Sequence, residues 1–137
     1  MSIETLWDDL QEATITLPID IIEKAIKGFN KKTADLNKNL RFELRINPYQ
    51  TSSQIISHSL YLNAPDLGGY SMLVLATSYN ISDVYPCTLT SYLGAEKEII
   101  SCDSDTNFEE ELVKLLDSMK SIVSKLLAQC PPMDLPF

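Results

Sequence analysis

The spacing of apolar side chains changes twice along this chain, and no other feature restricts its fold as strongly. Residues 18–29 repeat apolar side chains every three or four positions, which is the period of an amphipathic helix. Residues 40–46, LRFELRI, instead alternate apolar and polar side chains, as a strand with one buried face does. The helical period returns at residues 108–126. Strands therefore form one block between helices, which is typical of an α+β domain.

Two helices are predicted before the first strand. The first covers residues 3–13, where five apolar side chains lie at helical spacing: Ile3, Leu6, Trp7, Leu10 and Ala13. The second begins at Pro18, because its missing N–H costs nothing in the first turn of a helix. Gly28 weakens the end of this helix. Residues 30–39 form a polar connection, with a short continuation of the helix through Leu36 as the alternative.

A meander of four or five strands is predicted next. The strands cover residues 40–46, 54–62, 70–79, 84–93 and 98–102. The connections between them are short and carry Gly, Pro, Asn and Asp, so each strand runs antiparallel to the one before it. Pro86 indicates that the fourth strand lies at an edge, because proline cannot donate to the hydrogen-bond ladder of a sheet.

A long C-terminal helix packed on the sheet completes the predicted fold. Residues 106–109 have the T-x-x-E pattern of a capping box, and apolar side chains recur at four-three spacing as far as Leu126. A Pro-Pro pair ends the helix. We expect a single α+β domain at residues 1–130 and a proline-rich tail at residues 131–137. The tail either docks on a partner or a neighbouring subunit, or lies against its own domain or frays.

The strand at residues 70–79, YSMLVLATSY, breaks the alternation expected of a strand with one buried face. Regular alternation places Leu73 and Leu75 together, on the face away from the predicted core. That second apolar face needs a cover. Two covers are open: the N-terminal helix that carries Trp7, or another protein chain. Leu73 and Leu75 are therefore candidate partner-binding residues.

The net charge of the chain is -8, from 11 basic and 19 acidic residues. Binding to nucleic acid through its phosphates and adhesion to an anionic membrane both need a basic surface, so neither is expected. The charge is also uneven: seven of the 11 basic residues lie at 24–45, and eight acids lie at 96–117. These stretches are either solvated surfaces or two surfaces of opposite sign that select a partner.

Arg41, Glu43 and Arg45 alternate on the outward face of the strand at residues 40–46. A charged ladder of this kind usually faces water. If it faces a partner instead, reversal of both arginines weakens binding and changes its dependence on salt. The three residues are candidate partner-binding residues for this reason.

The cysteines and the N-terminus indicate the compartment. The three cysteines are odd in number and lack C-x-x-C spacing, so a reducing cytoplasm is expected. The N-terminus has early acids and lacks the basic and apolar regions of a signal peptide. No apolar run reaches the length of a membrane span. No metal-ligand spacing and no cofactor motif occurs, so neither a metal nor a cofactor is expected.

His58 is the only histidine, and it shares a predicted strand face with Leu60 and Leu62. It is either a core residue that bonds a backbone carbonyl, or a base or ligand in a pocket between sheet and helices. Tyr61 and Tyr85 are candidate lining residues of that pocket. No nucleophile elbow and no phosphate loop accompanies them.

The predicted function is a non-catalytic, cytoplasmic protein–protein interaction or regulatory module that acts as a dimer. Immunity proteins, antitoxins and secretion chaperones have this size and acidic charge, so an inhibitor or a small chaperone is expected. The alternative is a small-molecule-binding or enzymatic domain with a pocket near His58. A mimic of nucleic acid is disfavoured because the acids are split between the two ends of the chain. A homodimer with stacked sheets fits the two-sided strand at residues 70–79.

Overall fold

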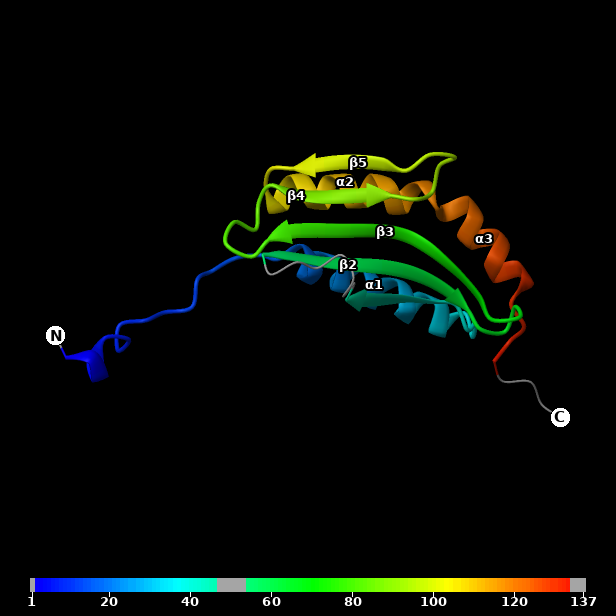
Figure 1. Ribbon diagram of the computed structural model, residues 1–137. Helices are drawn as coiled ribbons and strands as arrows, with labels where there is room; N and C mark the ends of the chain where they lie inside the picture. The colour runs from blue at the N-terminus through cyan, green and yellow to red at the C-terminus, as the bar shows by residue number, and fades with distance from the viewer. Residues whose placement is uncertain (1, 47–53, 134–137) are drawn as a thin grey trace.

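A five-stranded antiparallel sheet with its α-helices on one face forms the body of the molecule (Figure 1). The computed structural model describes residues 2–46 and 54–133. The strands are β1 (Arg41–Ile46), β2 (Ile55–Ala64), β3 (Tyr70–Asn80), β4 (Cys87–Ser91) and β5 (Glu98–Cys102). They lie side by side in chain order, and each is antiparallel to the next. The predicted α+β class and antiparallel meander are therefore confirmed.

Helix α1 (Pro18–Asp35) begins at the predicted proline. The Asp20 carboxylate accepts a hydrogen bond from the Leu17 backbone N–H at 3.1 Å and so satisfies one unpaired donor of the first turn. The helix continues through Gly28 to Asp35, in agreement with the alternative in which it extends to Leu36. Asn30 Oδ1 accepts from the backbone N–H of Phe42 at 3.1 Å, which ties the helix to β1.

The predicted helix at residues 3–13 does not form. Only Ile3–Thr5 makes a 3-10 turn, and further backbone bonds between residues three apart reach Leu10. Every residue from 2 to 16 is exposed, and Figure 1 shows this segment running away from the body. An isolated helix shorter than about 12 residues is marginal in water without a surface to pack on, so amphipathic spacing alone did not suffice. We call residues 2–16 the arm.

The predicted long C-terminal helix consists of two helices, α2 (Asp105–Ser118) and α3 (Lys120–Gln129). They are separated at Met119, whose backbone N–H donates to the Leu116 carbonyl at 3.1 Å and tightens the last turn of α2. The N-cap of α2 is Ser104, two residues before the predicted Thr106. Its Oγ accepts from the backbone N–H of Asn107 at 3.1 Å.

Strand β4 lies inside the sheet, and the edge position predicted from Pro86 is wrong. β4 pairs with β3 on one side and with β5 on the other. The strand begins at Cys87, so Pro86 lies just outside the ladder and removes no hydrogen bond from it. The two edges are β1 and β5.

A β-bulge in β3 decides which face each of its apolar residues occupies. Leu60 of β2 pairs with Leu75, whereas the next residue, Tyr61, pairs with Leu73. The extra residue, Val74, reverses the alternation of β3 at this point. Val74 and Leu75 are both 0% exposed and belong to the core, whereas Leu73 lies beside Tyr61 on the other face. The expectation that Leu73 and Leu75 share a face is corrected accordingly.

The face of the sheet turned away from the helices, which we call the open face, has little apolar surface to cover. The large apolar or aromatic side chains on this face include Tyr61, Leu73 and Ile99. Six other residues near its middle are small. They are Ser57, Ser59, Ala76, Ser78, Thr88 and Thr90. The predicted cover by a helix carrying Trp7 is absent from the described structure, where this indole is 68% exposed. The bulge removes most of the need for a cover.

The chain returns to its own body after α3. Pro132 forms an isolated β-bridge with Lys38, and the backbone N–H of Met133 donates to the Asn37 carbonyl at 3.0 Å. The first residues of the predicted tail therefore lie against their own domain. The rest of the tail, residues 134–137, lies outside the described residues.

Candidate functional site

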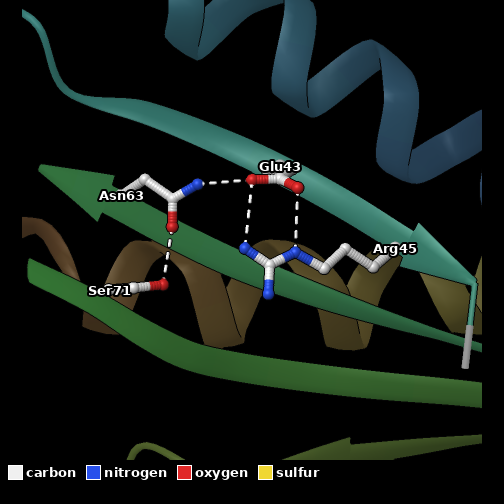
Figure 2. Close-up of polar contacts among 4 residues, drawn as sticks. All are labelled: Glu43, Arg45, Asn63 and Ser71. Carbon is white, nitrogen blue, oxygen red and sulfur yellow. Dashed lines mark hydrogen bonds and ion pairs between the residues drawn. The ribbon is translucent and has the colours of Figure 1, made fainter. Parts of the chain in front are cut away.

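The charged ladder of β1 is exposed, and two of its residues bond each other (Figure 2). The Arg45 guanidinium donates to both oxygens of Glu43, at 2.8 and 3.2 Å. Asn63 of β2 donates to the same carboxylate at 2.6 Å, and the Ser71 hydroxyl of β3 donates to Asn63 at 2.6 Å. The hydrogen bonds from Arg45 and then from Asn63 lower the pKa of Glu43. The ladder is thus the start of a polar network across three strands of the open face.

The three candidate pocket residues lie apart. His58 is 5% exposed and lies on the helix-facing side of the sheet. Tyr61 lies on the open face, where the guanidinium carbon of Arg45 is 4.1 Å from its ring centroid. Tyr85 donates its hydroxyl hydrogen to the carbonyl of Thr16 at 2.6 Å, at the root of the arm. His58 and Tyr61 are an odd number of positions apart on one strand, so alternation alone could have separated them.

His58 and Thr77 form a buried polar pair in the layer between sheet and helices. They lie opposite each other on β2 and β3, and Thr77 is 1% exposed. Neither His58 Nδ1 nor Thr77 Oγ1 has a hydrogen-bond partner among the described residues. Burial lowers the pKa of His58, and the nearby Glu23 carboxylate opposes this effect. The fold therefore favours the uncharged imidazole.

The stability of the fold is expected to fall as the pH drops below 6.5, through the protonation of His58. Because the pKa of His58 is lower in the folded chain than in the unfolded one, the unfolded chain binds the proton first. The contribution of His58 to the free energy of unfolding is thus fully present above pH 6.5, and it is lost as the pH falls toward the pKa of His58 in the folded chain. Denaturant unfolding measured at pH 5.0 to 7.5 tests this.

His58→Leu serves as the comparison for that measurement, since His58 is the only histidine of the chain. The variant is expected to lose less stability between pH 7 and pH 5. It also removes a buried nitrogen that has no hydrogen-bond partner, and such an unpaired atom destabilises the wild type by about 1–3 kcal/mol. Identical pH profiles for the two proteins would show that His58 titrates as it does in the unfolded chain and would contradict the prediction.

The uneven charge of the sequence lies on two sides of the molecule. β1 and α1 carry most of the basic stretch at 24–45, whereas β5 and α2 carry most of the acidic stretch at 96–117. β1 and β5 are opposite edges of the sheet. A meander keeps chain order in space, so separation along the sequence becomes separation across the molecule.

An apolar groove with a volume of about 320 Å³ lies between α1 and the junction of α2 and α3, and we call it the helix groove. Its lining residues are Ala25, Phe29, Phe42, Val113, Leu116, Asp117, Met119, Lys120 and Val123. The rings of Phe29 and Phe42 pack with their centroids 4.3 Å apart. Val113 is 59% exposed, and Lys120 and Asp117 form an ion pair of 2.8 Å. No local sequence pattern indicates this groove, because it forms between helices far apart in the chain.

Exposed large apolar side chains are concentrated on the arm. Five large apolar side chains are exposed by 39% to 80%: Ile3, Leu6, Trp7, Leu10 and Ile15. Single exposed apolar residues are ordinary on a protein surface, whereas a cluster of them makes the arm a candidate interaction site. The arm also carries four acids and neither lysine nor arginine. The sequence signal for it was the helical spacing at residues 3–13.

Residues 2–46 and 54–133 contain no group of three or more His, Cys, Asp or Glu side chains that could hold a metal ion. In the same ranges, no helix has both the length and the apolar character of a membrane span. The three cysteines are buried free thiols. No protein-family model, curated protein or solved structure matches this chain.

Proposed function

We propose that this chain is a non-catalytic protein–protein interaction module that docks on its partner through the arm. The observation that supports this is the exposure of five large apolar side chains on a segment that runs away from the body. Burial of apolar surface drives most protein association, and a fully buried Leu or Ile side chain contributes about 1.5–3 kcal/mol. The arm can offer its side chains to a partner without loss to the core, since it takes no part in the core.

The open face forms the second part of the proposed interaction surface. Arg41, Glu43, Arg45 and Leu73 lie together on this face, whereas Leu75 is buried and offers no surface. Glu43 and Arg45 already satisfy each other, so a partner that meets them gains specificity more than affinity.

The proposed role is regulatory, and the proposed compartment is the cytoplasm. An inhibitor of the immunity or antitoxin type and a small chaperone both act by covering a surface of another protein. Identification of the partner distinguishes these roles. Cys87 and Cys102 lie opposite each other on β4 and β5 as free thiols, a state that a reducing compartment maintains.

A pocket-based function near His58 has one observation in its favour, the unpaired buried atoms of His58 and Thr77. We rank it second. Three surface hollows among the described residues are lined by other side chains, and neither Tyr61 nor Tyr85 shares the position of His58.

Photocrosslinking from the arm tests the proposed function. A photoreactive amino acid in place of Leu10, which is 70% exposed, is expected to form discrete adducts with protein in cells of the source organism. The same group in place of Ile81, which is 57% exposed between β3 and β4, serves as the matched control. Mass spectrometry identifies the adducts. Equal and diffuse labelling from both positions would contradict a docking role for the arm.

A further inference from the structure

We propose that the arm of one copy binds as a helix in the helix groove of a second copy, and that this exchange is reciprocal in a two-fold symmetric dimer. This inference rests on the proposed docking role of the arm and names its partner. Each copy carries both halves of the contact, the arm and the groove, so one closed dimer uses them all.

The arm has the residue pattern of a helix that lacks its packing surface. Ile3, Leu6, Trp7 and Leu10 occupy positions i, i+3, i+4 and i+7, which form one face of a helix. Backbone bonds between residues three apart already form incipient turns from Ser2 to Leu10. An apolar groove supplies the packing surface that such a helix lacks. A helix that docks in a groove contacts it through apolar side chains at this spacing.

The helix groove has the complementary chemistry. Its lining is mostly apolar, and its volume of about 320 Å³ has room for large side chains such as those of Trp7 and Leu10. Val113 at its edge is 59% exposed in the single chain. A docked apolar helix face would cover this residue and the partly exposed ring of Phe29 on α1.

Charge favours the same pairing. The arm carries Glu4, Asp8, Asp9 and Glu12 and no basic residue. The helix α1, which supplies Ala25 and Phe29 to the lining, carries exposed lysines. They are Lys24, Lys27, Lys31 and Lys32. Lys120 at the start of α3 lines the groove and pairs with Asp117, and α2 carries Glu109 and Glu110 one turn before Val113. The acids that flank the apolar face of the arm are therefore expected on the side of α1 rather than of α2.

The root of the arm favours a second copy over the same chain. The hydrogen bond from Tyr85 to the Thr16 carbonyl and the start of α1 at Pro18 hold the root, and Figure 1 shows the arm leaving the body there. To reach its own groove, the arm would have to reverse direction beside this bond. Two exchanged arms, each with four apolar anchors, would bury on the order of 1,500 Å² in total, the size of a standard stable interface.

Sedimentation and tryptophan fluorescence of the full-length protein test the exchange, because Trp7 is the only tryptophan. The wild type is expected to be a dimer in which the Trp7 emission moves to shorter wavelength as concentration rises. Leu10→Asp in the arm and Val113→Glu in the groove are each expected to raise the dimer dissociation constant at least about 30-fold. Both residues are exposed in the single chain, so both variants are expected to fold.

Ile99→Glu is the matched control, since Ile99 is 63% exposed on β5 and far from the groove in the strand order. It is expected to leave the dissociation constant within about threefold. A mixture of the two defective variants gives the decisive result, with Trp7→Phe added to the Leu10→Asp chain. The Leu10→Asp chain keeps an intact groove, and the Val113→Glu chain keeps an intact arm with the reporting Trp7. The two chains are expected to form a heterodimer in which that arm fills that groove, so the blue-shifted emission returns.

Three outcomes would overturn the exchange. They are a monomer at all concentrations, a dimer unaffected by Val113→Glu, and a mixture that shows no rescue. A monomer with protected Trp7 would place the arm in its own groove. A monomer with exposed Trp7 would refute this inference only, because adducts between Leu10 and another protein would still support the docking role. Absence of both adducts and dimer would refute the two together.

Discussion

Replacement of Leu75 with alanine is expected to lower the free energy of unfolding by about 3 kcal/mol, whereas replacement of Leu73 costs less than about 1 kcal/mol. Leu75 is 0% exposed in the core, and its loss leaves a cavity below the helices. Leu73 is partly exposed on the open face, where solvent can fill the space that it leaves. The bulge at Val74 is the physical reason for the difference.

Equilibrium unfolding in urea, followed by circular dichroism, measures both costs. The two variants remove the same atoms from the same strand two positions apart, so each serves as the control for the other. Equal costs would mean that the two leucines share an environment, as regular alternation predicts, and would refute the bulge.

The cysteines of the folded protein are expected to resist alkylation at pH 8 by a factor of at least about 100 relative to the unfolded chain. All three are buried. Burial, followed by the charge of Cys102, raises the pKa of Cys87 from 9.0 to about 12. A thiol with that pKa carries roughly a thousandth of the reactive thiolate of a thiol at 9.0. Burial likewise raises the pKa of Cys102 and Cys130.

Timed labelling with iodoacetamide and mass spectrometry of the peptides tests this protection. Ser101→Cys is the matched control, because Ser101 is exposed on β5 beside the buried Cys102. The new thiol is expected to react at the rate of an unfolded cysteine. Labelling of Cys87 at the rate of position 101 would show that β4 and β5 separate readily, and would refute the protection.

Elements with a strong local signal were predictable from the sequence. The strand at residues 40–46 alternates over its whole length, and Pro18 marks the start of a helix, so both appear where predicted. The meander was predictable because short turns join neighbouring strands. The exposed charged ladder of Arg41, Glu43 and Arg45 followed from the same alternation.

The candidate sites depended on contacts that no local pattern contains. The hydrogen bond from Asn63 to Glu43 needs the register between β1 and β2. The helix groove forms only where α1 packs beside the junction of α2 and α3 at Met119. The apolar spacing at residues 108–126 is continuous and predicts one helix, so it does not indicate that junction. These features are set by packing between distant segments and by the pairing register.

By itself, the sequence determined the class of the fold, the order of its strands and the apolar, acidic character of the arm, because each depends on residue type and local period. The tertiary structure decided the rest. Pairing with β2 placed the bulge and turned Leu75 into the core while Leu73 stayed on the open face. The body offers residues 3–13 no packing surface in the single chain, so their helical pattern remains an exposed arm. Both results have one physical reason: the conformation of a segment is set by the surface against which it is buried.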